Sequence, residues 1–328
     1  MEQMKLTFVN VGYGEAILLE CPDAAFPGGC FTMLIDGGGA DPSEFIGNST
    51  GRIPLNEYLK ASALDHLDLV VNTHPHEDHV SGLLKTVETI PVRELWQILS
   101  PVFCRKGMRE LDVSLARNRS QDKFLHALND CAALSRLVAD AGGKVLQVRP
   151  GMQGELCRGL RYTVLGPSEE KLRDLEARCA ALYAEADEEA FLEKLNDLDA
   201  QLNNRSIILL LEYGSTRILL PGDTNLAGYE GIDPALLKAD LFKVGHHGQR
   251  DGADEKLLEA VQAKAVVCCA NSVRLYNSAD PRLMAMIRSH GAARYFSDCP
   301  PVEGETIPPH SALVFIIGED GTIEAEYQ

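Results

Sequence analysis

Long hydrophobic runs are missing from this sequence of 328 residues, although its 45% hydrophobic and 24% charged residues are ordinary for a globular protein. The longest apolar stretches, such as Ile207–Leu211 and Leu313–Ile317, fall far below the roughly 20 residues that a membrane-spanning helix needs. The segment Met1–Lys5 lacks a charged region followed by an apolar stretch, so we expect no signal peptide. These absences argue against a membrane protein and against a secreted one.

Basic residues are scarce relative to acidic ones. The chain has 31 lysines and arginines against 48 aspartates and glutamates, which gives a formal net charge of −17. Proteins that bind long nucleic acids use basic faces to displace counterions, and this chain has the opposite overall field. We therefore expect a small-molecule or short-oligonucleotide substrate and argue against long duplex DNA and a membrane surface as partners.

Cysteine pairs of the C-x-x-C type are also missing. The nine cysteines are an odd number, and the neighbours Cys268 and Cys269 have poor geometry for bridging to each other. Reduced thiols in a cytoplasmic protein are the better interpretation.

No linker rich in proline, glycine or serine divides the chain, so we expect residues 1–328 to form a single domain. Two segments, at about 101–141 and 168–202, interrupt the succession of strands and are predicted as helical insertions. In the second segment, Glu185–Glu189 interrupts the apolar stripe, which leaves open two helices or one helix with a shifted face. This segment is interpreted as a lid or as a contact in a homodimer.

Two common catalytic motifs are missing as well. The chain has no G-x-S-x-G motif, so serine-hydrolase chemistry has no support. The glycines at Gly12, Gly14 and Gly37–Gly39 lack the spacing of a nucleotide-binding loop.

Residues of metal-binding type do occur, and they follow predicted strands in both halves of the chain. A strand over 67–72 precedes a histidine cluster, and a helix is expected to begin near Ser81. Because several strand ends can meet at one edge of a sheet structure, we expect an active site there, built from Asp36, His74, Asp223 and the pair His246 and His247.

The histidine cluster has the pattern H-x-H-x-D-H, formed by His74, His76, Asp78 and His79. Neutral imidazoles and a carboxylate are ligands that suit zinc or another first-row divalent metal. In an extended segment His74 and His76 point to the same side and can hold one ion, while Asp78 and His79 then face a second ion. The alternative is a surface histidine cluster at a strand-to-helix turn.

The segment from Thr73 to Gly82 resembles the signature of the metallo-β-lactamase fold hydrolases. The resemblance continues in order along the chain, from about Val9 to Phe315. The segment that begins at Val9, together with the ending His-His-Gly248, is most similar to the branch that includes the hydrolase domain of the competence protein ComEC. The other matching motifs are Leu34-Ile-Asp36, Leu219-Leu-Pro-Gly-Asp223 and Val244-Gly-His-His247.

The resemblance implies an α/β fold, a four-layer αββα sandwich with a dinuclear site, here carrying helical insertions. It implies two divalent ions, zinc or alternatively manganese. In this sequence it places His74 and His76 on the first metal, Asp78 and His79 on the second, Asp223 between both, and His247 on the second.

Other residues are expected to support the site. Adjacent residues at a strand end point in opposite directions, so we expect His247 to bind metal and His246 to face the substrate or support a ligand. Asp36 is expected to accept a hydrogen bond from a ligating histidine, or else to be a turn residue. Asp78 and His246 are the expected catalytic residues.

Asn203, Asn204 and Gln249 stand where this sequence departs from the family pattern. Asn203 and Asn204 stand where family members often have another histidine for the first metal, and asparagine there is similar to the ComEC-like branch. Gln249 stands where that branch usually has serine. We expect these three residues to support a ligand or contact substrate.

The expected function is that of a dinuclear metal-dependent hydrolase. Two metal ions can share a hydroxide that is nucleophilic near neutral pH. The ComEC-like resemblance favours a phosphodiesterase with nuclease-like activity. The alternatives are a lactone, thioester or other carbonyl ester hydrolase on the same metal core, or a non-catalytic metal-binding scaffold.

Overall fold

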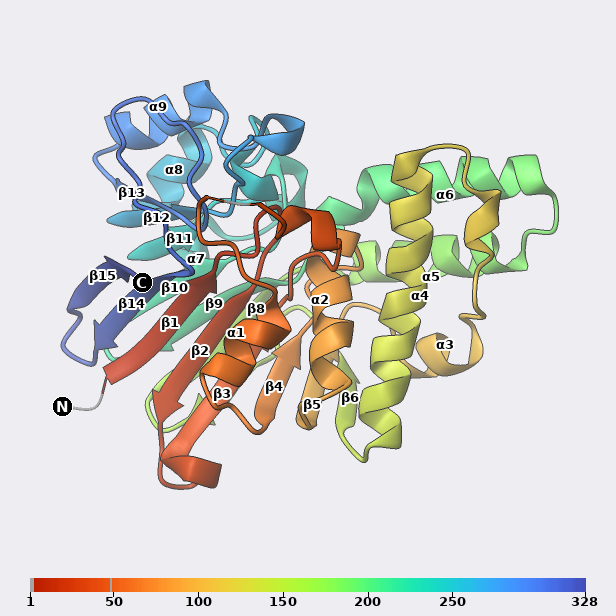
Figure 1. Cartoon of the computed structure of the whole chain (residues 1–328), viewed down its shortest axis with the longest axis horizontal. Coiled ribbons are helices and arrows are strands. Elements are labelled where there is room, and N and C mark those ends of the chain that lie inside the picture. The colour runs from red at the N-terminus through yellow and green to blue at the C-terminus, as the bar shows by residue number, and fades with distance from the viewer. Residues whose placement is uncertain (1–2, 48) are drawn as a thin grey trace.

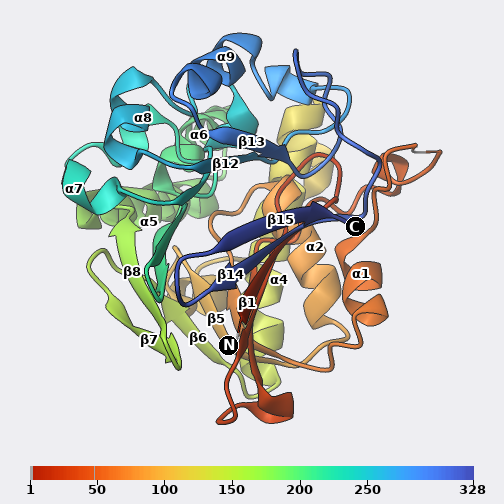
Figure 2. The same cartoon turned by 90° about the vertical axis from the view of Figure 1, so that its left-hand side faces the viewer.

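A computed structural model describes residues 3–47 and 49–328. Two β-sheets lie face to face, and helices cover their outer faces (Figure 1, Figure 2). This is the α/β sandwich of four layers that the sequence predicts. All nine cysteines are free thiols, as expected. Among the described helices, none is both long and apolar enough to cross a membrane.

The first sheet has eight strands in the order β15-β14-β1-β2-β3-β4-β5-β6. It is parallel from β3 to β6 and antiparallel elsewhere. All five residues of β4 are buried, as expected for a parallel strand covered on both faces. The strands are β1 Gln3–Val9, β2 Ile17–Pro22, β3 Cys30–Ile35, β4 Leu67–Val71, β5 Val92–Gln97, β6 Lys144–Gln147, β14 Ala312–Gly318 and β15 Ile323–Tyr327.

The second sheet has seven strands in the order β13-β12-β11-β10-β9-β8-β7. Strands β9 and β10 form a hairpin at Gly214, where they pair antiparallel with Tyr213 opposite Thr216. From β10 to β13 the sheet is parallel. The strands are β7 Gln153–Cys157, β8 Leu160–Gly166, β9 Ile208–Tyr213, β10 Thr216–Leu220, β11 Leu241–Lys243, β12 Ala265–Cys268 and β13 Ala293–Phe296.

The helices fall into two groups. One group packs on the first sheet, where α2 contacts α4 and α4 contacts β5 and β6. The other group covers the second sheet, where α9 contacts β13. The helices are α1 Leu55–Ala61, α2 Glu77–Val87, α3 Pro101–Lys106, α4 Arg119–Asp140, α5 Glu169–Ala184, α6 Glu188–Leu202, α7 Pro234–Leu237, α8 Glu255–Val261 and α9 Pro281–Ser289.

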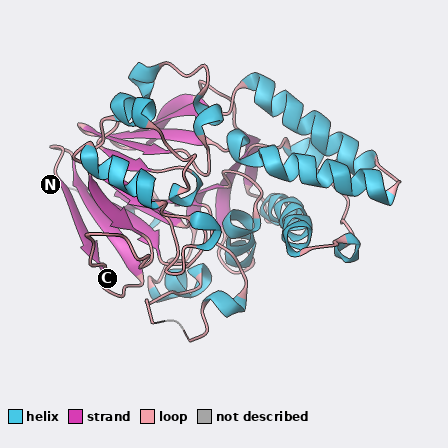
Figure 3. Cartoon of the chain, turned by 90° about the horizontal axis from the view of Figure 1, so that it is seen from above, coloured by secondary structure: helices cyan, strands magenta, loops and turns pink. Residues whose placement is uncertain are grey.

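The two predicted helical segments lie together at one end of the molecule, where α3 to α6 gather (Figure 1, Figure 3). Residues 168–202 form two helices rather than one, because the chain is extended at Glu185 and Asp187 caps α6 by accepting from the amide of Ala190. That these segments are insertions into a single domain stays a prediction.

The expected start of the helix after the histidine cluster was wrong. Helix α2 begins at Glu77 rather than near Ser81, with His76 at its N-cap position. Acidic residues are favourable in the first turn of a helix, because they face the unpaired amides and the positive end of the helix dipole. Glu77 and Asp78 occupy that turn, so the metal-binding pattern itself starts the helix.

Candidate metal centre

The chemistry-bearing residues lie at the ends of four strands. Asp36 follows β3, His74 follows β4, Asp223 follows β10 after a Pro-Gly turn, and His247 follows β11. Strands β3 and β4 belong to the first sheet, and β10 and β11 belong to the second. The site is therefore shared between the two sheets.

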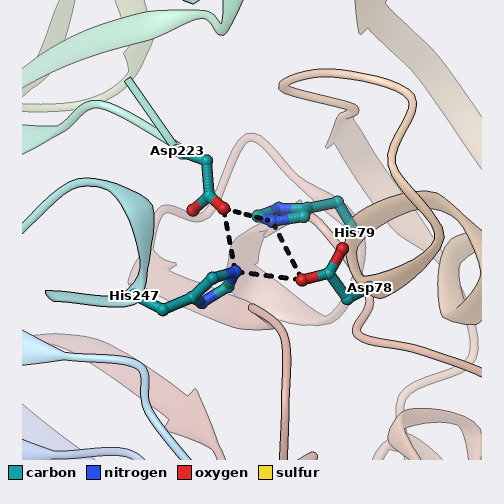
Figure 4. Close-up of side chains that lie close together, drawn as sticks. All are labelled: Asp78, His79, Asp223 and His247. Atoms are coloured by element: carbon teal, nitrogen blue, oxygen red, sulfur yellow. Dashed lines mark ion pairs between the residues drawn. The ribbon is translucent and has the colours of Figure 1, made fainter. Parts of the chain in front are cut away.

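Two of these side chains, Asp223 and His247, form a compact cluster with Asp78 and His79 (Figure 4). His247 Nε2 lies 2.9 Å from Asp78 Oδ2 and 2.8 Å from Asp223 Oδ2. His79 Nε2 lies 3.3 Å from Asp223 Oδ2 and 3.8 Å from Asp78 Oδ2. Two imidazole nitrogens thus face two carboxylate oxygens across a space of atomic size. We call Asp78, His79, Asp223 and His247 the buried quartet.

Asp36 holds His79 from the side away from the quartet. Its Oδ2 lies 2.7 Å from His79 Nδ1, and it also accepts from the amide and the hydroxyl of Thr73 at 2.8 and 2.6 Å. A carboxylate accepts only, so the proton of the neutral imidazole lies on Nδ1 and the lone pair of Nε2 faces the quartet. The expected role of Asp36 as a support for a histidine matches this geometry.

His247 is fixed in a similar way. Its Nδ1 donates to the backbone oxygen of Cys269 at 2.9 Å, which leaves Nε2 for the quartet. Its neighbour His246 points elsewhere and lies 2.9 Å from Asp251. Both histidines have positive φ, 51° and 49°, a conformation that is uncommon outside glycine and asparagine and concentrates at functional sites.

Asp223 is held by a buried lysine that the sequence argument did not identify. Lys243 Nζ lies 3.2 Å from Asp223 Oδ1 and donates to the backbone oxygen of Gly222 at 2.8 Å. It also forms an ion pair with Glu15, and both side chains are fully buried. Because Lys243 contacts Oδ1, it is the other oxygen, Oδ2, that faces the histidines of the quartet. Lysine and glutamate inside strands or apolar turns give no motif by which sequence alone could pair them.

The charges of the quartet depend on one another. Burial lowers the pKa of His247, but Asp223 and Asp78 outweigh it and raise the pKa to about 9. In the same way Asp223 and Asp36 overcome burial and hold the pKa of His79 well above its usual range. Burial raises the pKa of Asp223, yet His247 and His79 hold it well below its usual value. The site is built to hold positive charge between its carboxylates.

The quartet fits a divalent metal ion. His79 Nε2 and His247 Nε2 are buried, and neither has a hydrogen-bond partner among the described residues, although carboxylate oxygens lie close by. An unpartnered buried nitrogen costs free energy unless something satisfies it. Two imidazoles and two carboxylates are an accepted ligand set for zinc and for manganese.

The other half of the site consists of His74 and His76. His74 Nε2 and His76 Nδ1 lie 2.9 Å apart, so both lone-pair positions face the same point. The ring centroids of His74 and His79 are 4.2 Å apart, which places this pair beside the quartet. Burial, with His79 and His76 nearby, lowers the pKa of His74 well below its usual value. A neutral imidazole is the form that binds metal.

A cavity of about 400 Å³ opens onto both halves. The helical segments form one wall of it through Lys123, Phe124, Asp199 and Asn203. Asn204 does not line it, whereas Asn203 does. From the sheet side the cavity is lined by Tyr13, His76, Asp78, Asp223, His246 and Gln249.

Tyr13 is a site residue that the sequence argument missed. Its ring centroid lies 4.6 Å from that of His247, and its hydroxyl interacts with Gln249. It stands between Gly12 and Gly14, which both have positive φ. A Cβ at Gly14 would lie 2.4 Å from the backbone oxygen of Asp78. The Gly-x-Gly pattern, dismissed as a nucleotide loop, was the available signal for this close approach.

Comparison with known proteins agrees with the resemblance seen in the sequence. The model of the Metallo-beta-lactamase superfamily matches residues 26–126, a range that includes Asp36 and the whole histidine cluster. ComE operon protein 3 of Bacillus subtilis (strain 168) is 25% identical over 205 residues. The match covers 59% of this chain and 24% of that protein, so this chain spans only a small part of its relative.

Solved structures of similar fold are distant in sequence. A putative metal-dependent hydrolase from Parabacteroides distasonis ATCC 8503 is 12% identical with a TM-score of 0.44, covering 90% of this chain and 93% of that one. Zn²⁺-bound PqqB from Methylobacterium extorquens is 13% identical with a TM-score of 0.43, covering 89% and 97%.

Proposed function

We propose that this chain, a hydrolase of the metallo-beta-lactamase superfamily, cleaves phosphodiesters with two divalent metal ions, zinc or manganese. The observation that carries the proposal is the convergence of the buried quartet and of His74 with His76 on one cavity. Metal ions bound there would supply Lewis-acid activation of water and of the scissile bond near neutral pH.

Different residues of the chain are proposed to bind the two ions and to orient the ligands. His79, His247 and Asp78 would hold one ion, His74 and His76 would hold the other, and Asp223 would contribute to both. Asp36, Lys243 and the carbonyl of Cys269 fix the orientation of these ligands. Preorganised ligands need no rearrangement when charge develops in the transition state.

Residues at the cavity wall orient the substrate. Tyr13 and Gln249 lie together beside His247 and offer hydrogen-bonding groups to a phosphoryl oxygen. His246 faces the cavity and is oriented by Asp251, which suits it to contact the substrate or the leaving group. Asn203 offers an amide at the opposite wall.

The size of the cavity supports a small substrate. A volume of about 400 Å³ is in the range of small-molecule sites, and the net charge of −17 disfavours long duplex DNA. A nucleotide or a short oligonucleotide fits both observations. The helices of 168–202 form part of the cavity wall, which supports a role of this segment as a lid. A homodimer contact through the same helices stays a prediction.

The test compares two generic substrates. Zinc- or manganese-loaded protein and its His76→Ala variant are assayed with bis(p-nitrophenyl) phosphate and with p-nitrophenyl acetate. We expect turnover of the phosphodiester that is lost in the variant. Turnover of the acetate alone, by a protein that holds its metals, would contradict the proposal and favour a carbonyl ester, lactone or thioester substrate.

A further inference from the structure

The first metal site has a partner in the second helical segment. His76 Nε2 lies 3.0 Å from Oδ1 of Asp199, a residue of α6. The other carboxylate oxygen of Asp199 accepts from the hydroxyl of Ser120 in α4 at 3.3 Å. Asp199 therefore connects both helical segments to a histidine of the site.

The contact is on the far side of the imidazole from the metal position. The nitrogen of His76 that faces His74 is Nδ1, at 2.9 Å, whereas Asp199 contacts Nε2. A carboxylate accepts only, so a neutral His76 carries its proton on Nε2 and presents the lone pair of Nδ1 to the position shared with His74. This is the arrangement by which a carboxylate fixes the tautomer and the ring orientation of a metal-binding histidine.

The arrangement repeats what Asp36 does for His79 in the buried quartet, with one difference. Asp36 and His79 are both fully buried, whereas the side chains of His76 and Asp199 are 18% and 31% exposed. The first site also has no third histidine, because Asn203 and Asn204 occupy the segment before β9. The first metal ion therefore has fewer imidazole ligands, so its affinity depends more strongly on the orientation of His76.

We propose that Asp199 is a positioning residue for the first metal ion. Its carboxylate, on α6, orients His76, so the helical segment 168–202 controls the occupancy of the first metal ion and not that of the second. The inference rests on the proposed dinuclear function. It makes 168–202 part of the metal site rather than only a wall of the cavity.

The experiment is a stepwise titration of the metal-free protein (residues 1–328) with Co²⁺, followed by calorimetry and by the visible absorption of the bound ion. The variant is Asp199→Asn. The control is Glu193→Gln, which removes an exposed carboxylate from the same helix. Thermal unfolding of both variants checks that α6 is intact.

We expect two binding events in the unaltered protein. In Asp199→Asn one event weakens by about 10- to 100-fold and its absorption band shifts, while the other event is unchanged. In Glu193→Gln both events keep their affinity. Asp199→Glu should recover part of the lost affinity, because a carboxylate is restored.

Two outcomes would overturn the inference in distinguishable ways. Two events of unaltered affinity in Asp199→Asn, or equal weakening of both, would contradict the role of Asp199 and leave the dinuclear proposal standing. An unaltered protein that binds fewer than two ions would contradict the proposed function, and the inference with it.

Discussion

The two halves of the candidate metal centre are built differently. Three ligands of the buried quartet are fixed by neighbouring groups: His79 by Asp36, Asp223 by Lys243 and His247 by the carbonyl of Cys269. In the other half, His76 lies at the cavity and contacts Asp199 from a helix outside the sheets. The difference teaches that the sheets support the quartet, whereas the proposed first metal site, at His74 and His76, would depend on helices that the sandwich itself does not require.

The adjacent histidines give the largest expected effect. His247 belongs to the quartet and His246 does not, while both have positive φ, which asparagine tolerates. We expect His247→Asn to lower turnover about a thousandfold or more, since a metal supplies several kcal/mol of transition-state stabilisation. The matched variant His246→Asn should keep its full metal content and lose less activity. Metal analysis and steady-state kinetics measure metal content and turnover in both variants. Equal losses of turnover in the two variants would contradict the assignment of His247 as the metal ligand.

The buried ion pair of the rigid half gives the next effect, on stability. Lys243→Met leaves Glu15 and Asp223 without their buried cation, so the free energy of unfolding of the metal-free protein should fall by about 3–5 kcal/mol. Adding Glu15→Gln should recover part of this loss. Urea denaturation measures the free energy of unfolding of the single and the double variant. A Lys243→Met protein as stable as the unaltered protein would contradict this role of Lys243.

Asp36 and Asp68 provide a matched pair for metal affinity. Both are buried, and each accepts hydrogen bonds from the amide and hydroxyl of a threonine, Thr73 and Thr32 respectively. Only Asp36 also contacts His79. Asp36→Asn should weaken metal binding by about 10- to 100-fold, whereas Asp68→Asn should not. Calorimetric titration measures the metal affinity of both variants. Similar metal affinities in the two variants would contradict the role of Asp36.

The dependence of metal affinity on pH tests the charges of the quartet. The pKa of His247 is raised to about 9 in the metal-free chain, so this histidine carries a proton at neutral pH. A metal ion must displace that proton, so the apparent affinity should rise by about tenfold per pH unit for each displaced proton between pH 7 and 9. Titration calorimetry in buffers of different ionisation enthalpy counts the released protons. Affinity that does not change between pH 7 and 9 would contradict the charge distribution of the quartet.

Local patterns predicted much of the fold. The strand expected over 67–72 is β4, Leu67–Val71, whose residues are all buried. Strands β7, β13 and β15 were not expected; their described residues are largely exposed or half-buried, so they lack the apolar runs that identify inner strands. All three lie at the edges of their sheets. A cytoplasmic location stays a prediction.

The site was predictable where ligands are adjacent in sequence and unpredictable where the fold brings them together. The histidine cluster has a recognisable spacing. Asp199 does not, because it is one of several acidic residues on α6, and only the packing of α6 against α4 selects it. Lys243 and Glu15 are separated by most of the chain, so their pairing follows from the approach of the two sheets.

The most direct test of the account is turnover of bis(p-nitrophenyl) phosphate by metal-free protein as zinc or manganese is added in equivalents. The quartet should fill first, because three of its four ligands are buried and held by neighbouring groups, and activity should appear only as the second equivalent binds at His74 and His76. Full activity at one equivalent would contradict a dinuclear mechanism with unequal halves. A lack of turnover at two bound equivalents would contradict the phosphodiesterase assignment.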